Sequence, residues 1–285
     1  MTRLPITKTP KPYVGGAFIR SESGRVFPIN DAAGNFFANM PQCTRKDLRN
    51  AVEAAAKAGP GWAKRTAYNR GQILYRLGEM LEARRQEMID TLALFGGAKD
   101  AAAREVDVSV DRLVYYAGWT DKYEQVLGNV NPVAAPYFNF TVTDPMGVVG
   151  VIAPDQPPLL GLISLVAPVI ASGNTVVASV SETVPYPAVL LGEMLATSDL
   201  PGGVVNLLTG YRKELVPTFA THEHIRGISA AANAEERKAL RLGAAESVKR
   251  VHFVDADTDW FADKAQSAYA IRDFIEFKTT WHPVG

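Results

Sequence analysis

The chain has 285 residues, 47% of them hydrophobic and 21% charged, and its 30 basic and 30 acidic residues give a formal net charge of +0. This balance argues against a nucleic-acid-binding face, and no apolar run reaches the roughly 20 residues of a membrane span. The N-terminus lacks the apolar core of a secretion signal, and a single cysteine excludes an internal disulfide, so a cytoplasmic location is expected.

The first third of the chain predicts short strands followed by helices. Residues 1–43 indicate strands and turns, with a hairpin across the polar stretch RSESGR at 20–25. Thr44 and Asp47 resemble a capping box, and the helix that they begin is expected to end at Gly59-Pro60. Apolar spacing predicts two further helices, at about 68–94 and 101–126.

The residue pattern changes after residue 130, from helical spacing to strand-like runs. YFNFTVTDP at 137–145 alternates like an exposed antiparallel strand, whereas MGVVGVIAP at 146–154 is a continuous apolar run, typical of a buried parallel strand. Strands and helices then alternate as far as KRVHFVD at 249–255, and YAIRDFIEFKTTWHPVG at 269–285 closes the chain as a strand-like tail. The alternation predicts an α/β fold with a doubly wound, mainly parallel sheet.

Several segments together resemble the N-terminal, cofactor-binding half of the aldehyde dehydrogenase superfamily. They keep the family's order, and they are YVGGAFI, DLRNAVEAAAKAGPGW, GVVGVIAP, APVIASGNTVV, SDLPGGVVNLLTG and ESVKRV. The resemblance implies a Rossmann-like domain at 148–265 with an N-terminal hairpin and helical region at 1–130 packed on it. It also implies an antiparallel interface arm at 131–147 and, at 266–285, a tail strand that pairs across a subunit interface in relatives.

The resemblance stops where the catalytic domain of the family is expected. Only about 15 residues separate the KRVHFVD strand from the tail, which leaves no room for the domain that carries the family's catalytic cysteine. The chain is therefore identified as a truncated member that keeps the cofactor-binding half and the C-terminal tail strand.

Aldehyde oxidation of this kind needs a thiolate nucleophile, a donor to the oxyanion and a general base. The lone Cys43 precedes the first helix and is expected to be a small residue in a turn. By resemblance the oxyanion-donor turn is Pro154-Asp155-Gln156, where Gln156 replaces an asparagine. The base falls on Val254, which cannot take a proton, and Asp255 beside it is expected on the opposite face of a strand. No residue is therefore assigned a catalytic role.

The resemblance also implies NAD(P), whose ribose relatives hold with a lysine and a glutamate. Those positions are Ser179 and Glu182 here, and the glycine and serine of the phosphate turn are Ala232-Asn233. Asn233 can still cap a helix. Cofactor binding is assigned only to Glu182, as a remnant, with Pro154 and Gln156, and NAD(P) binding is expected to be weak or lost.

Three functions remain open on the sequence. The first is a non-catalytic family member, inactive alone, that forms a homo-oligomer or a hetero-oligomer with a full-length aldehyde dehydrogenase. The second is an NAD(P)-dependent aldehyde oxidoreductase that uses unconventional residues, and the third is a nucleotide-sensing module that binds through Glu182. His222 and His224 lack a third ligand at suitable spacing, so no metal site is expected. No nucleic acid or membrane partner is expected either.

Overall fold

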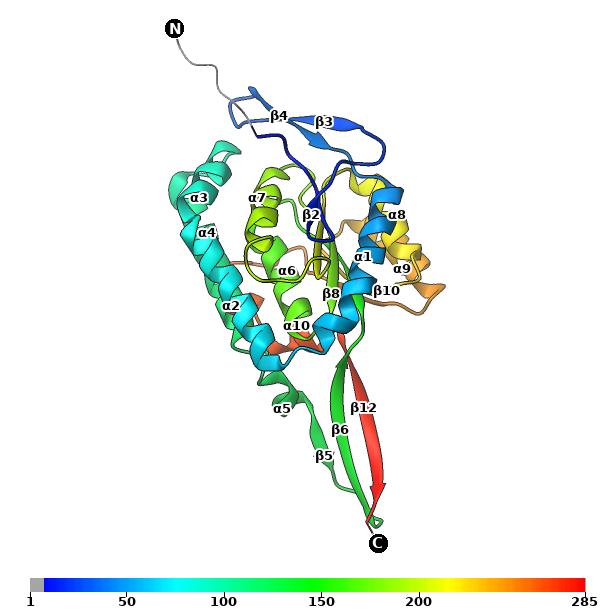
Figure 1. The fold of residues 1–285 in the computed structure, drawn as a ribbon. Helices are drawn as coiled ribbons and strands as arrows, with labels where there is room; N and C mark the ends of the chain where they lie inside the picture. Colours follow the sequence, from blue (N-terminus) through cyan, green and yellow to red (C-terminus); the bar gives the residue numbers. More distant parts are fainter. Residues whose placement is uncertain (1–7, 285) are drawn as a thin grey trace.

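The computed structural model describes residues 8–284, which fold around one long sheet from which a narrow arm projects (Figure 1). The sheet has the strand order β11-β10-β7-β8-β9-β1-β2. The five consecutive parallel strands are β7 (Val148–Ile152), β8 (Thr175–Ser179), β9 (Val205–Leu208), β10 (Ile225–Ala230) and β11 (Arg250–Phe253). A tight hairpin of β1 (Tyr13–Val14) and β2 (Ala17–Phe18) extends it antiparallel. The doubly wound, mainly parallel sheet is confirmed.

Helices cover both faces of this sheet, and each face has its own apolar core. One layer consists of α1 (Arg45–Ala63), α8 (Arg212–Thr221) and α9 (Ala234–Ala245). The other layer consists of α2 (Ala67–Ala83), α3 (Arg85–Leu94), α4 (Lys99–Ala117), α6 (Leu160–Ala171), α7 (Tyr186–Leu195) and α10 (Ala268–Arg272). Every residue of β7, β8 and β9 is buried, because a strand between two helical layers has no solvent face. Gly150 lets α8 approach, since a Cβ there would lie 2.7 Å from the Phe219 ring.

The hairpin expected across RSESGR is wrong. Gly15 and Gly16, with φ of +63° and +85°, close the turn between β1 and β2 earlier in the chain. The next pair is β3 (Val26–Asn30) with β4 (Phe36–Pro41). The polar stretch itself is a loop, and Asp47 holds it through the Ser21 hydroxyl at 3.0 Å and the Glu22 N–H at 2.8 Å.

The three expected helices exist with different bounds. α1 continues through Pro60, because the next turn anchors Trp62, a buried side chain that donates its indole N–H to the Ile170 carbonyl at 2.9 Å. The helix expected at 68–94 breaks into α2 and α3 at Arg84. The helix expected at 101–126 divides into α4 and the short α5 (Tyr123–Leu127).

The arm is a three-stranded antiparallel sheet in the order β12-β6-β5 (Figure 1). Its strands are β5 (Asn129–Asn131), β6 (Tyr137–Pro145) and β12 (Ile275–Pro283). The strand expected at 137–145 is confirmed, whereas the C-terminal tail begins with α10 before it becomes β12. None of the helices in the described part of the chain combines the length and hydropathy of a membrane-crossing segment.

Candidate functional site

The strand order reverses at β7, which lies between β8 on one side and β10 on the other. Ligands of doubly wound sheets bind at such a reversal, outside the carboxyl ends of the strands. Here the two loops that leave β7 and β10 contact each other directly, because the Ala231 N–H donates to the Ile152 carbonyl at 2.9 Å. The loops that follow β7, β8 and β10 therefore define the candidate site.

Asp155, in the loop after β7, organises the loop after β8. Its Oδ1 accepts from the Glu182 N–H at 2.8 Å, the Ser181 hydroxyl at 3.2 Å and the Thr183 N–H at 3.3 Å. These bonds join the two loops side by side. The carboxylate at 155 thus has a structural role at the site, which the sequence did not indicate.

Arg212, the first residue of α8, closes this edge of the sheet. Its backbone N–H donates to the Glu182 carboxylate at 2.7 Å, so Glu182 acts as a cap on the first turn of α8. Its guanidinium donates to the Ala153 carbonyl and lies 3.5 Å from the Asp155 carboxylate. With its side chain only 12% exposed, Arg212 fills the space outside the end of β7. The sequence analysis missed this residue, although a cation in the first turn of a helix is unfavourable and therefore points to an external partner.

Ser179 and the turn after β10 complete the site. Ser179 is fully buried at the end of β8, and its hydroxyl has no hydrogen-bond partner among the described residues. Asn233 caps α9, as predicted, by accepting from the Glu236 N–H at 2.9 Å. Arg237 of the same helix donates to the carbonyls of Ala232 and Val254. The chain's own side chains therefore bind the backbone of this turn.

The structure does not bring the three assigned residues into one binding surface. Pro154 is buried and packs on α6 at Gly161, where a Cβ would lie 2.2 Å from the proline ring. Gln156 is exposed and lines a pocket of about 500 Å³, to which Glu182 does not contribute. Only Glu182 belongs to the network around Asp155.

The expectation for Asp255 is wrong. β11 ends at Phe253, so the alternation of strand faces no longer applies two residues later. The Val254 N–H donates to the Ala230 carbonyl at 2.9 Å, and the Asp255 carbonyl accepts from the Thr258 hydroxyl at 2.8 Å in a turn. The segment that corresponds to the family's base is thus used to end a strand.

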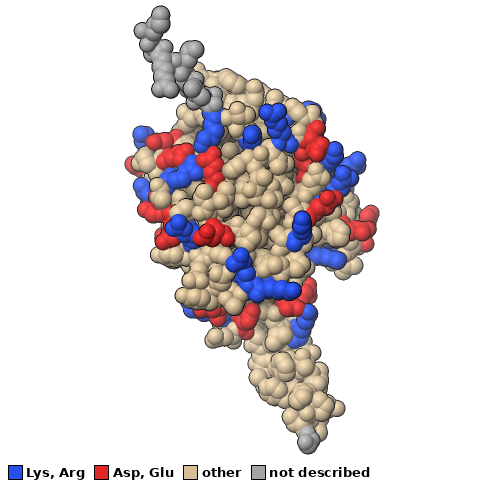
Figure 2. All heavy atoms as spheres, in the orientation of Figure 1, with Lys and Arg blue, Asp and Glu red and all other residues tan. Residues whose placement is uncertain are grey.

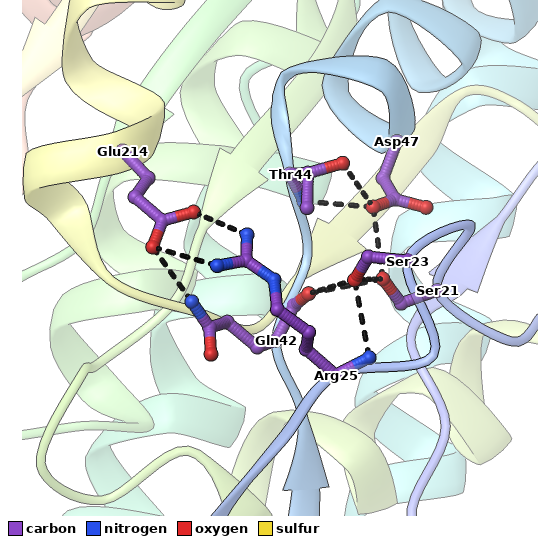
Figure 3. Close-up of polar contacts among 7 residues, drawn as sticks. All are labelled: Ser21, Ser23, Arg25, Gln42, Thr44, Asp47 and Glu214. Atoms are coloured by element: carbon purple, nitrogen blue, oxygen red, sulfur yellow. Dashed lines mark hydrogen bonds and ion pairs between the residues drawn. The ribbon is translucent and has the colours of Figure 1, made fainter.

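Cys43 lies at the junction of β4 and α1, where it is fully buried and donates its N–H to the Thr209 carbonyl at 2.9 Å. Burial, with a smaller contribution from Asp47, raises the pKa of its thiol to about 12. Figure 3 shows that the carboxylates near this junction, Asp47 and Glu214, are bound by neighbouring polar groups. Glu214 pairs with Arg25 at 2.7 Å and accepts from the Gln42 amide at 2.6 Å. The sequence predicted a small residue between a strand and a helix, and the structure adds that this cysteine is part of the core.

Comparison with known proteins identifies the family to which this fold and site belong. The model of the aldehyde dehydrogenase family matches residues 18–254. The chain belongs to the aldehyde dehydrogenase family. It is similar to retinal dehydrogenase 2 of Mus musculus, with 34% identity over 90% of the chain and 53% of the relative. A putative aldehyde dehydrogenase, DhaS, of Bacillus subtilis shows 30% identity over 85% of the chain and 50% of the relative.

Solved structures of aldehyde dehydrogenases share this fold. The NAD+ complex of an aldehyde dehydrogenase from Bacillus cereus superposes with a TM-score of 0.82 and 27% identity, over 86% of the chain and 50% of that protein. The chain thus spans about half the length of the family members that it matches.

The residues of this aldehyde dehydrogenase family chain do not fit the dinucleotide that the family resemblance implies. The Glu182 carboxylate already accepts from the backbone N–H of Arg212 at the start of α8. The short hydroxyl side chain of Ser179 cannot extend to a ribose as a lysine would, and the Arg212 side chain fills the space outside the end of β7. Glu235 and Glu236, in the first turn of α9, repel a phosphate. Among the described residues no group of three or more metal-ligating side chains is found, and His222 and His224 lie in the turn between α8 and β10.

Cys43 provides a direct test of its role as a core residue. At pH 8 the native thiol is expected to react with iodoacetamide about a thousandfold more slowly than in urea, because its raised pKa suppresses the thiolate. Timed alkylation followed by mass spectrometry measures both rates. Fast labelling of the folded protein would show that the thiol is accessible and would reopen the oxidoreductase hypothesis.

Proposed function

We propose that this aldehyde dehydrogenase family chain is a non-catalytic subunit, a pseudoenzyme whose role is to assemble through its arm. Its partner is a second copy or a full-length aldehyde dehydrogenase. The observation that carries the proposal is the group of exposed apolar side chains that β5 and β6 place on one face of the β12-β6-β5 sheet. A cytoplasmic location, supported by the single cysteine, is part of the same proposal.

One face of the arm, which we call the arm face, carries the apolar side chains of Val130, Phe138, Phe140 and Val142, and β12 adds Lys278, Thr280 and His282 opposite the β6 residues. The pairing of β5 and β6 places these apolar side chains on one side of the sheet, where Val130 lies opposite Phe140. Val130 is 59% exposed, and Phe138 and Val142 are each 47% exposed. Figure 2 shows the arm with few charged side chains in this view, in contrast to the body. Exposed apolar side chains grouped in this way on a projecting sheet support assembly with another chain.

The other face of the arm supports the same proposal. Trp281 and Tyr137 stack edge to face there with ring centroids 5.7 Å apart, and they are 58% and 41% exposed. The outer edge of β12 adds the backbone groups of a nine-residue strand. A long strand edge with aromatic side chains readily pairs with another chain.

The segment that replaces the catalytic domain supports the absence of catalysis. Between β11 and α10 the chain runs through residues 254–267, which are bound to α4. Arg112, only 2% exposed, donates to the carbonyls of Trp260 at 2.9 Å and Ala265 at 3.0 Å. Tyr116 is within hydrogen-bond distance of the Ser267 backbone. These contacts fasten the short segment to α4.

The experiment is a measurement of molar mass by size-exclusion chromatography with light scattering. The purified chain is run alone and after co-expression with a full-length family member from the same host. A dimer or larger assembly in either run is the expected result. A monomer in both runs would contradict the subunit role, and aldehyde-dependent NADH production by the pure chain would contradict the absence of catalysis.

A further inference from the structure

The pocket that Gln156 lines has a composition unlike the rest of the site. It lies among the α3–α4 turn, the N-terminus of α6 and the segment 258–261, and its volume of about 500 Å³ is that of a small-molecule site. Its apolar walls include the rings of Phe95, Trp260 and Phe261. Trp260 and Phe261 belong to the short segment 254–267 between β11 and α10, so this segment supplies part of the pocket wall.

Glu105 of α4 is the buried polar group of this pocket. It is 7% exposed, and its Oε1 accepts from the N–H groups of Leu159 at 2.8 Å and Leu160 at 3.1 Å. Both bonds end on the same oxygen, and no hydrogen bond or ion pair joins Oε2 to a described residue. Oε2 is not one of the fully buried atoms that lack a partner, so it keeps some exposure to solvent. Burial raises the pKa of this carboxyl. A buried carboxylate without a cation is costly, so the free oxygen favours a ligand that donates.

The ionisable side chains that line the pocket are all acidic. Of the described residues that line it, the ionisable ones are Glu105 and Asp259, and none is a lysine, arginine or histidine. Arg104 lies over the Phe261 ring, 4.8 Å from its centroid, and thus supports the aromatic wall without being part of the lining. Aromatic faces and carboxylates both attract cations. A phosphate or carboxylate ligand is correspondingly disfavoured.

We propose that this pocket binds a small primary amine with an apolar body. The ammonium group donates to the free oxygen of Glu105, and the apolar body contacts Phe95 and Trp260. The site lies in the body of the molecule and takes no residue from the arm, so the inference does not depend on the proposed assembly.

The test is calorimetric titration of the full chain with 2-phenylethylamine and, in parallel, with the neutral 2-phenylethanol. The amine is expected to bind at least about tenfold more tightly than the alcohol, because a charge-assisted bond is lost in the alcohol. In Glu105→Gln the same preference is expected to disappear. The amide oxygen of that variant still accepts from Leu159 and Leu160, so a purely structural role of Glu105 would leave amine binding unchanged.

A second variant tests the pocket without changing residue 105, so the inference stays testable if Glu105→Gln does not fold. Ala101 is exposed at the rim of the pocket, and Ala101→Trp is expected to fill it and to abolish amine binding while the chain stays folded by circular dichroism. Equal affinity for amine and alcohol, an unchanged affinity in Glu105→Gln, or no heat of binding for the wild-type chain would each overturn the inference. The molar mass by light scattering is recorded for every sample, so that a failure of assembly is distinguished from a failure of the pocket.

Discussion

The proposed assembly is expected to dissociate into folded monomers when Val130 and Phe138 are both replaced with lysine. Both side chains are about half exposed in the single chain, so their loss removes little core packing. In an assembly they would be covered, and two ammonium groups would then be buried without partners. The loss is about 4 kcal/mol of association free energy, which raises Kd about a thousandfold.

Sedimentation velocity over a range of concentrations measures this change. Leu242→Lys is the matched control, because Leu242 is 66% exposed on α9 and far from the arm in the fold (Figure 1). The control is expected to assemble like the wild-type chain. If the double variant keeps the wild-type molar mass, the arm face is not the interface.

Replacing Arg112 with alanine is expected to lower the free energy of unfolding by about 3 kcal/mol. Arg112 is a buried residue of α4 that donates to the Ser164 hydroxyl of α6 at 2.7 Å and to two carbonyls of the segment 254–267. Alanine leaves these three acceptors without their donor, and a cavity remains in place of the side chain. Urea denaturation measures the loss.

Hydrogen exchange separates local from global loss in the Arg112→Ala variant. Amides in the segment 254–267 are expected to exchange faster than in the wild-type chain, whereas β7 and β8 keep their protection until global unfolding. Arg76→Ala is the control, since Arg76 is 46% exposed and forms an ion pair with Glu79 on the surface of α2. It is expected to cost less than about 1 kcal/mol. An equally small cost for Arg112→Ala would show that the segment does not depend on this side chain.

The segments that the sequence predicted well are those in which local pattern and burial agree. The apolar runs of β7 and β8 can only be central strands between two layers, so the doubly wound sheet follows from the pattern of residues. Asn233 is the same kind of case, because a cap and its partner Glu236 lie three residues apart. The strand β6 was equally clear from its alternation.

The errors fall where a distant contact outweighs the local signal. Pro60 usually marks the end of a helix, yet α1 continues because Trp62 bonds to Ile170, more than a hundred residues away. The hairpin failed for a related reason, since Asp47 on α1 holds Ser21 in a loop. In each case a contact distant in sequence decides the backbone path.

The sequence by itself determined the family and the doubly wound sheet, because both depend on residue identity and order. Only the tertiary structure showed which side chains contact one another at the candidate site and at the pocket. Arg212 closes the end of β7, Arg112 binds the segment 254–267 to α4, and Glu105 and Asp259 line one pocket. Such arrangements join side chains from separate elements, and their geometry is fixed by packing rather than by any local pattern.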